Sequence, residues 1–204
     1  EILKPHGRKF APDPASVKSA MVGGIVMNNA SGMNCGTHAS SDKELLSAKI
    51  VLADGTRLNT GDPESRTTFE KNHTPFLNKI IEIRDEIRND NELSDRIRKK
   101  YSIKNVTGLN LLPFVIYDDP FDIIAHLMVG SEGTLAFLSE VTMKTEHDYP
   151  YSASAMLYFS NIKDACRAVV AMKPGPVFSA ELLDKKSLAS VNDTTGTGLT
   201  AVLT

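Results

Sequence analysis

Residues 22–37 read VGGIVMNNASGMNCGT, and this stretch decides how the rest of the sequence is interpreted. Its glycines permit backbone conformations with positive φ and close approach of another group, and its small and amide side chains leave many backbone N–H donors uncovered. Such a stretch can line a large, flat, phosphate-bearing cofactor. A tight turn between two structured segments uses the same residue types, so the pattern alone leaves both interpretations open. It is neither a Walker loop nor a Rossmann GxGxxG pattern.

A second glycine-rich stretch, GSEGTL at residues 130–135, stands between a predicted helix and a predicted strand. Gly130 and Gly133 bracket a sharp reversal that would present backbone amides and the Thr134 hydroxyl on one side. A helix stop followed by an ordinary turn is the alternative. Taken singly, neither stretch identifies a function.

The composition limits the class of protein. The 204 residues are 41% hydrophobic and 24% charged, with a formal net charge of −2, which is typical of a soluble globular protein and lacks the basic excess of a nucleic-acid-binding surface. No apolar run approaches the roughly 18 residues of a membrane span. The two cysteines, Cys35 and Cys166, cannot supply a disulfide framework or a four-thiolate site, and no paired His/Glu spacing predicts a metal site.

Local signals in the first 60 residues predict loops, one short helix and a hairpin. Residues 1–15 contain three prolines and are expected to be extended. Ser16 is a candidate N-cap for a short helix that runs to about Met21 and ends at Gly23-Gly24. A strand is predicted over 47–53, with a turn at Asp54-Gly55 into a second strand over 56–59.

Helical periodicity begins after residue 63. Apolar residues recur at helical spacing from 76 to 87, and a second, basic helix follows up to residue 100, so 63–100 is predicted to be a helical insertion with solvated charged faces. Asp119-Pro120 predicts a helix start and Gly130 its stop, with a strand over 134–145.

The sequence changes character at residues 147–151. Two predicted strands, over 153–159 and 177–183, flank a helix that Ser160 would cap and that would place Cys166 in a core. A further helix is expected from about Asp184. This order is the opening of a split β-α-β arrangement.

The order of these elements resembles the FAD-binding domain of the vanillyl-alcohol-oxidase-like flavoproteins, in the branch that contains glycolate oxidase, D-lactate dehydrogenase and D-2-hydroxyglutarate dehydrogenase. The resemblance rests on PDP at 12–14, VGG at 22–24, NASG at 29–32, the strand into ADG at 53–55, and VGSEGTL at 129–135. Residues 28–39, the inserted basic helices, IKNVTG at 103–108 and DPFDII at 119–124 are similar to the long bacterial members with iron–sulfur motifs near their C-terminus.

The resemblance implies an α+β fold in which residues 1–147 form the second subdomain of a PCMH-type FAD-binding domain, with the insertion at about 63–100. Residues 149–204 would start an α+β, ferredoxin-like cap domain. The bare ends at Glu1 and Thr204 indicate a fragment, with the pyrophosphate-gripping loop upstream and the substrate-binding basic and histidine residues downstream. We therefore expect this chain alone to bind FAD weakly or not at all; a stoichiometric yellow cofactor retained through purification would contradict this.

Carried over position by position, the resemblance assigns FAD contacts to three groups of residues. Those beside the flavin and ribityl chain are Pro12, Met21, Gly23 and Gly24. Those of the loop that lines the cofactor are Asn28, Asn29, Ser31, Gly32 and Thr37. Those of the second wall are Glu132, Gly133, Thr134 and Leu138. Catalytic residues stay unassigned.

The implied function is oxidation of a D-2-hydroxy acid, of D-2-hydroxyglutarate or D-lactate type, to the 2-keto acid by hydride transfer to the flavin. A glycolate oxidase-like subunit and a non-catalytic flavin-fold interaction module are the alternatives. An iron–sulfur cluster is expected only in the full-length protein. That protein is expected in the cytoplasm, either free or associated peripherally with the inner face of the membrane. The electron acceptor and the oligomeric state are not assigned.

Two residues in the predicted cofactor loop have more than one interpretation. His38 could donate to the flavin or to a substrate anion, or simply be exposed. Cys35 could attach a flavin covalently, although the closer branch holds FAD noncovalently and a small buried thiol is the default.

Overall fold

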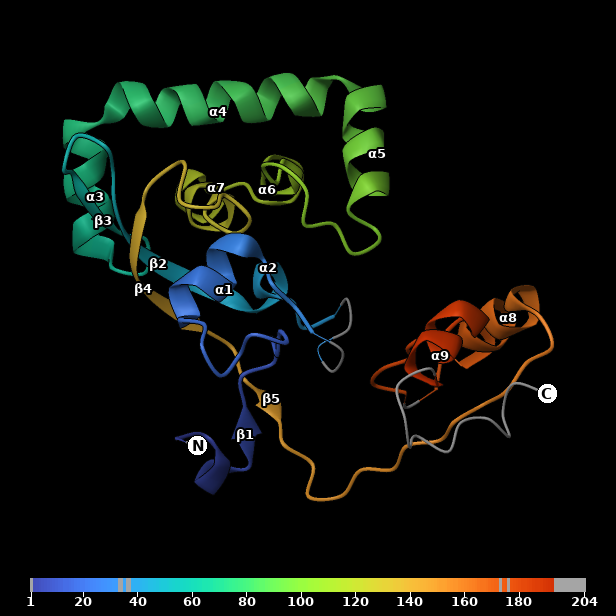
Figure 1. The fold of residues 1–204 in the computed structure, drawn as a ribbon. Coiled ribbons are helices and arrows are strands. Elements are labelled where there is room, and N and C mark those ends of the chain that lie inside the picture. The colour runs from blue at the N-terminus through green and yellow to red at the C-terminus, as the bar shows by residue number, and fades with distance from the viewer. Residues whose placement is uncertain (1, 33–34, 36–37, 173, 176, 193–204) are drawn as a thin grey trace. The chain divides into compact units, whose positions relative to one another are not determined.

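The computed structural model describes residues 2–32, 35, 38–172, 174–175 and 177–192 (Figure 1). The chain divides into two units, Glu1–Tyr149 and Pro150–Thr204, and each is considered by itself. The expected mixture of helices and strands is confirmed, whereas the assignment of residues 1–147 and 149–204 to a flavin subdomain and a cap stays a prediction.

The first unit contains a small antiparallel sheet of three strands. Its strand order is β3-β2-β4, with β2 (Leu45–Val51) between β3 (Arg57–Asn59) and β4 (Phe137–Met143). Ile50 lies opposite Leu58 on β3 and Leu138 on β4. The predicted hairpin at Asp54-Gly55 is confirmed, because Gly55 adopts φ +86° between the two strands, a conformation that glycine adopts without strain.

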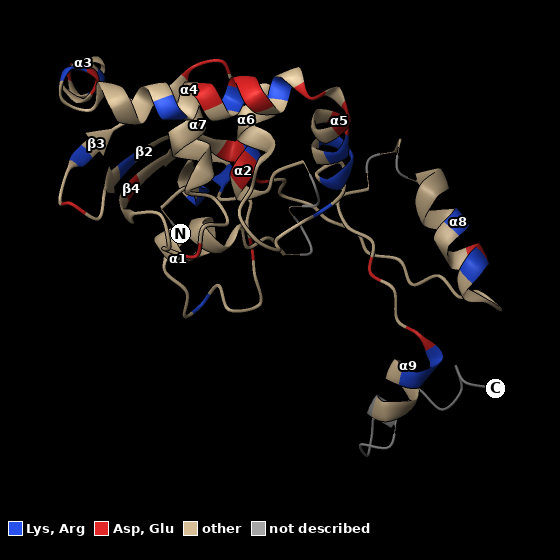
Figure 2. Ribbon diagram, turned by 90° about the horizontal axis from the view of Figure 1, so that it is seen from above, with Lys and Arg blue, Asp and Glu red and all other residues tan. Residues whose placement is uncertain are grey.

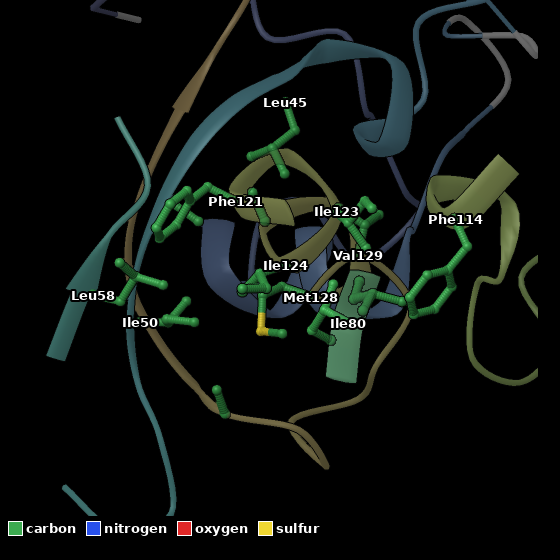
Figure 3. Close-up of a cluster of buried hydrophobic side chains, with 14 of the residues drawn as sticks. Leu45, Ile50, Leu58, Ile80, Phe114, Phe121, Ile123, Ile124, Met128 and Val129 are labelled. Atoms are coloured by element: carbon green, nitrogen blue, oxygen red, sulfur yellow. The ribbon is translucent and has the colours of Figure 1, made fainter. Parts of the chain in front are cut away.

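The core lies between this sheet and helix α7 (Pro120–Leu127). Asp119 caps α7 as predicted, since its carboxylate accepts a hydrogen bond from the Phe121 N–H at 2.8 Å. Figure 3 shows the side chains of α7 and of the turn that follows it facing those of β2 and β3. The buried residues labelled there are Leu45, Ile50, Leu58, Ile80, Phe114, Phe121, Ile123, Ile124, Met128 and Val129.

The helical character predicted for 63–100 is confirmed, whereas its being an insertion stays a prediction; the segment, called the insertion below, contains three helices. They are α3 (Pro63–Asn72), α4 (Thr74–Asn89) and α5 (Asn91–Lys100). Figure 1 shows α4 running along α7 and the short helix α6 (Leu112–Ile116), which the sequence analysis did not predict. Charged residues of both signs alternate along α4, whereas basic residues gather at the end of α5 (Figure 2). The buried stripe of α4 includes Leu77, while the predicted Phe76 is 40% exposed.

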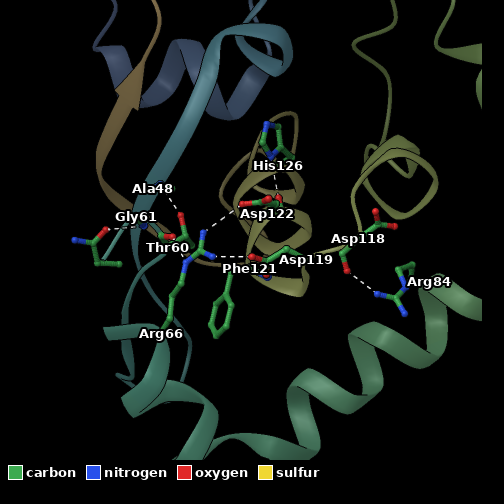
Figure 4. Close-up of polar contacts among 11 residues, drawn as sticks. Ala48, Thr60, Gly61, Arg66, Arg84, Asp118, Asp119, Phe121, Asp122 and His126 are labelled. Atoms are coloured by element: carbon green, nitrogen blue, oxygen red, sulfur yellow. Dashed lines mark hydrogen bonds and ion pairs between the residues drawn. The ribbon is translucent and has the colours of Figure 1, made fainter. Parts of the chain in front are cut away.

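Arginine side chains fasten the insertion to the core through polar contacts (Figure 4). Arg66 of α3 pairs with Asp119 at 2.7 Å and with Asp122 at 3.3 Å. It also donates to the Thr60 carbonyl and lies over the Phe121 ring, 5.1 Å from its centroid. One arginine therefore joins α3, the end of β3 and the start of α7.

The predicted helix from Ser16 to Met21 is wrong. Residues 16–20 form only turns, and the helix α1 (Val22–Asn28) begins where the prediction placed the stop at Gly23-Gly24. Each glycine costs a helix about 1 kcal/mol relative to alanine. Burial of Ile25 and Val26, which are 4% and 0% exposed, offsets this cost because it removes two large aliphatic side chains from water.

The start of the chain is also less extended than expected. Lys4–His6 form the 3₁₀ helix η1, and β1 (Arg8–Lys9) pairs with β5 (Glu146–His147). Gly7 ends η1 in the left-handed conformation, at φ 63°, which lets the chain turn into β1 despite the prolines. The four-residue helix α2 (Ser41–Glu44) leads directly into β2.

The second unit contains α8 (Ile162–Met172) and α9 (Lys185–Asn192). The strands predicted over 153–159 and 177–183 are not formed among its described residues. A strand needs a partner strand for its backbone hydrogen bonds, and no described strand pairs with either segment. Asn161, rather than Ser160, caps α8 by accepting from the Asp164 N–H at 3.0 Å. Asp184 accepts from the Ser187 N–H at 2.7 Å, as a cap of α9 should. Cys166 is exposed instead of lying in a core.

Candidate functional site

The two glycine-rich stretches meet in the structure. The Glu132 N–H donates to the Met27 carbonyl at 2.9 Å, and the Asn28 side-chain amide donates to Glu132 Oε1 at 2.5 Å. The Asn28–Glu132 contact joins residues that are 104 positions apart in the sequence. The end of α1 and the turn after α7 therefore form one continuous surface.

The backbone at this junction is held in uncommon conformations. Asn29 and Glu132, at φ 52° and 54°, are the two non-glycine residues with positive φ in the described part of the chain. Gly130 and Gly133 lie beside them at φ 82° and 76°. Asn29 takes this conformation as the C-cap of α1, and glycine adopts it without strain. Glu132 is therefore the one residue here with a strained backbone, a feature that tends to occur where a ligand is bound.

The loop after α1 is fixed on both sides. Asn29 is 8% exposed, and its side-chain oxygen accepts from the Asp42 N–H at 3.3 Å. A Cβ built on Gly32 would overlap both the carboxylate and the carbonyl of Asp13. Pro12 is fully buried next to this contact. The 12–14 segment and the 29–32 loop therefore approach so closely that only glycine fits at position 32.

The other expected contact residues differ in what they can offer a ligand. Met21 is 82% exposed, and a Cβ on Gly24 would have nothing within 4 Å, so both face open space. The Leu138 side chain lies in the hydrophobic core, which leaves only its backbone for the predicted FAD contact. The Thr134 hydroxyl donates to the Ser131 carbonyl at 2.6 Å, so it retains only acceptor capacity. Thr37 lies outside the described residues.

His38 and Cys35 have different surroundings. His38 is exposed. The Cys35 thiol is 1% exposed, lies 3.8 Å from the Gly32 carbonyl and packs with Ala11 and Ala39. The default interpretation of Cys35 as a small buried thiol is thus confirmed.

Two titratable side chains of the first unit are buried. Desolvation lowers the pKa of His126, whose Nδ1 lies 2.8 Å from the Asp122 carbonyl and whose ring stacks on Tyr117. Desolvation also raises the pKa of Glu44, and the nearby Glu146 adds to this, while Lys144, His38 and Arg8 oppose it. Glu44 is 6% exposed, and its Oε2 has no hydrogen-bond partner in the described part of the chain.

Glu44→Gln is expected to stabilise the chain at neutral pH. A carboxyl whose pKa is raised in the folded state contributes stability below its unfolded pKa, near 4.5, and loses that contribution as the pH rises through the folded pKa. Removing the buried charge should raise the free energy of unfolding at pH 7 by about 1 kcal/mol. Urea unfolding at pH 4 and pH 7 measures this difference. An equal or lower stability of the variant at pH 7 would contradict the burial argument.

Comparison with known proteins finds a similar family for the first part of the chain. Residues 1–61 match a protein family described as an FAD binding domain. The match covers Pro12, α1 and the 29–32 loop, whose contacts with residues 130–134 are described above.

Several longer proteins are similar along nearly the whole chain. A D-2-hydroxyglutarate dehydrogenase from Haemophilus influenzae is 26% identical over 92% of this chain, and a D-lactate dehydrogenase from Archaeoglobus fulgidus is 26% identical over 90%. The glycolate oxidase subunit GlcD of Escherichia coli is 24% identical over 95%. The chain spans only 19%, 30% and 29% of the lengths of these three proteins.

Neither a metal centre nor a membrane span is found among the residues that the structure describes. No group of three or more His, Cys, Asp or Glu side chains is arranged to hold a metal ion there. Within the same residues, no helix combines the length and the apolar character needed to cross a bilayer.

One pocket beside the 29–32 loop was missed by the sequence analysis. It lies between the 29–43 segment and residues 101–106. The motif IKNVTG at 103–108 served only as a mark of family resemblance, and nothing in its composition predicts that Lys104 and Asn105 lie beside Ser31. Only the tertiary fold brings these residues together.

Proposed function

We propose that this chain supplies one wall of the FAD site of an enzyme that oxidises a D-2-hydroxy acid to the 2-keto acid. The observation that carries the proposal is the junction of the 22–32 and 130–134 segments through Asn28 and Glu132. The match of residues 1–61 to an FAD binding domain supports it.

The residues at this junction fit such a cofactor. Gly24 is exposed with open space beyond it, so a flat ring system can approach the backbone of α1. Ser31 is 6% exposed, and its hydroxyl has no hydrogen-bond partner in the described part of the chain. A ligand that carries hydroxyl and phosphate oxygens can supply that partner.

When bound, FAD supplies the acceptor for the hydride that leaves the substrate. The described residues would hold and orient the cofactor: the α1 surface would lie beside it, and the Asn28–Glu132 hydrogen bond would keep the 22–32 and 130–134 segments at a fixed spacing. Names of relatives favour D-2-hydroxyglutarate or D-lactate as the substrate. A glycolate-oxidising subunit is the second candidate, favoured by the similarity to GlcD. We assign no catalytic residue in this chain.

Gly24→Ala tests this placement because it should change stability and FAD affinity in opposite directions. Alanine in place of an exposed helical glycine is expected to raise the free energy of unfolding by about 0.5–1 kcal/mol. The added methyl group would occupy space where the cofactor approaches, so the dissociation constant for FAD should rise about tenfold or more. Calorimetric titration with FAD measures the dissociation constant, and urea unfolding measures the free energy of unfolding.

Asn78→Ala on the exposed side of α4 is the matched control, and it should leave FAD affinity unchanged. If Gly24→Ala is more stable than the original chain but binds FAD with the same affinity, the cofactor does not lie against α1 and the proposal is wrong.

A further inference from the structure

The pocket between the 29–43 segment and residues 101–106 adjoins the proposed FAD wall and lies outside helix α1 itself. Its volume is about 240 Å³. One side consists of residues from the 29–43 segment, including Ser31 and Lys43, and the other consists of residues 101–106, including Lys104 and Asn105. Sites for drug-sized ligands have volumes of about 300–1,000 Å³, so this pocket suits a small ion or a single functional group.

Two polar side chains that line the pocket have an unused hydrogen-bonding atom. Asn105 Oδ1 accepts from the Thr107 N–H at 3.0 Å, which fixes the orientation of the amide. Asn105 Nδ2 is buried and has no acceptor among the described residues. The Ser31 hydroxyl, across the pocket, is also buried and unpartnered there. Buried donors are normally paired, so the pocket lacks an acceptor for both groups.

The charges around the pocket leave one cation without a counter-ion. Asp42 is engaged twice, since its carboxylate accepts from the Ser40 hydroxyl at 2.5 Å and pairs with Lys43 at 3.4 Å. Lys104 has no ion pair with any described carboxylate and is exposed at the mouth. The net field at the pocket is therefore positive, and the unused donors need an acceptor.

We propose that this pocket is an oxyanion site, in which Asn105 Nδ2 and the Ser31 hydroxyl donate to one oxyanion and Lys104 balances its charge. A carboxylate and a phosphate group share this chemistry, since each offers acceptor-only oxygens and negative charge. Asn29 and Ser31 also belong to the proposed FAD wall, so the inference rests in part on the proposed function. Titration without FAD keeps the outcome for this site separate from the outcome for cofactor binding.

The test is a calorimetric titration of the 204-residue chain, without FAD, against inorganic phosphate and separately against D-lactate at constant ionic strength. Asn105→Asp keeps the oxygen that accepts from Thr107 but replaces the free donor with a negative oxygen. It should weaken binding of the accepted anion by at least about tenfold. Asn78→Asp adds the same charge on α4, outside the pocket, and should leave binding within about twofold of the original chain.

Saturable binding of phosphate alone would support a phosphate group as the occupant, and saturable binding of D-lactate would support a carboxylate. Absence of saturable binding for both anions would overturn the proposal, as would equal affinities of Asn105→Asp and Asn78→Asp. If Asn105→Asp does not fold, as judged by its urea unfolding curve, the anion affinity of Lys104→Gln is measured instead. Lys99→Gln on α5 is then the control for loss of one positive charge. Equal affinities of these two variants would likewise overturn the proposal.

Discussion

Gly32→Ala is expected to destabilise the chain by about 2–3 kcal/mol and to abolish measurable FAD binding. The added Cβ would overlap the carboxylate and the main-chain carbonyl of Asp13, so the 12–14 segment and the 29–32 loop would have to move apart. A main-chain carbonyl cannot rotate out of the way as a flexible side chain can. The displacement would also move Ser31, which belongs to the proposed FAD wall.

Urea unfolding and calorimetric titration with FAD measure these two effects. For the unfolding measurement, Gly24→Ala is the matched control because it makes the same chemical change eight positions earlier, where the new methyl group meets nothing within 4 Å and should stabilise the helix. For FAD binding, the control is Asn78→Ala. Equal unfolding free energies for the two variants would show that the close approach at Gly32 has no energetic consequence.

Arg66→Met is expected to lower the free energy of unfolding by about 2–3 kcal/mol. Most of this loss comes from the Thr60 carbonyl, which would lose the donor at Arg66, since Thr60 is only 1% exposed. The ion pairs with Asp119 and Asp122 add less because both carboxylates are more than one-third exposed. The variant would also lose the cation–π interaction between the Arg66 guanidinium and the Phe121 ring. Methionine keeps the aliphatic stem, so the measured loss reports the guanidinium contacts.

Lys79→Met is the control for Arg66→Met. It removes a cation from an exposed ion pair on α4, the pair between Lys79 and Glu82, and should cost less than about 0.5 kcal/mol. Urea unfolding at pH 7 compares the two. A loss for Arg66→Met no greater than that for Lys79→Met would mean that the insertion is not held to the core through this side chain.

Elements with their own local signals were predicted from the sequence. The Asp54-Gly55 turn, the capped α7 and the insertion α3–α5 all carry turn residues, caps or helical periodicity within a short window. The position of α1 was missed because Gly23-Gly24 has the local signature of a helix stop. Burial of Ile25 and Val26 against the rest of the core overrides that signature.

The candidate site shows the same division. The two glycine-rich stretches could be marked from the sequence because glycines and small amides are unusual in such density. The hydrogen bonds of Asn28 and Glu132 that join them, and the placement of Asn105 beside Ser31, could not be predicted because they depend on packing between residues far apart in the chain. In the second unit, residues 153–159 have a strand-like pattern but no paired strand among the described residues, so pattern alone did not determine structure.

The most direct test of the central claim is a titration of the ¹⁵N-labelled chain with FAD, followed amide by amide by NMR. Weak binding suffices, because millimolar FAD shifts the amide signals in proportion to occupancy. The account predicts that the largest shifts fall on Gly23, Gly24, Asn28, Asn29, Ser31 and Gly32 together with Glu132, Gly133 and Thr134. Shifts confined to another surface, such as Ser47 and Lys49 on β2, would contradict it.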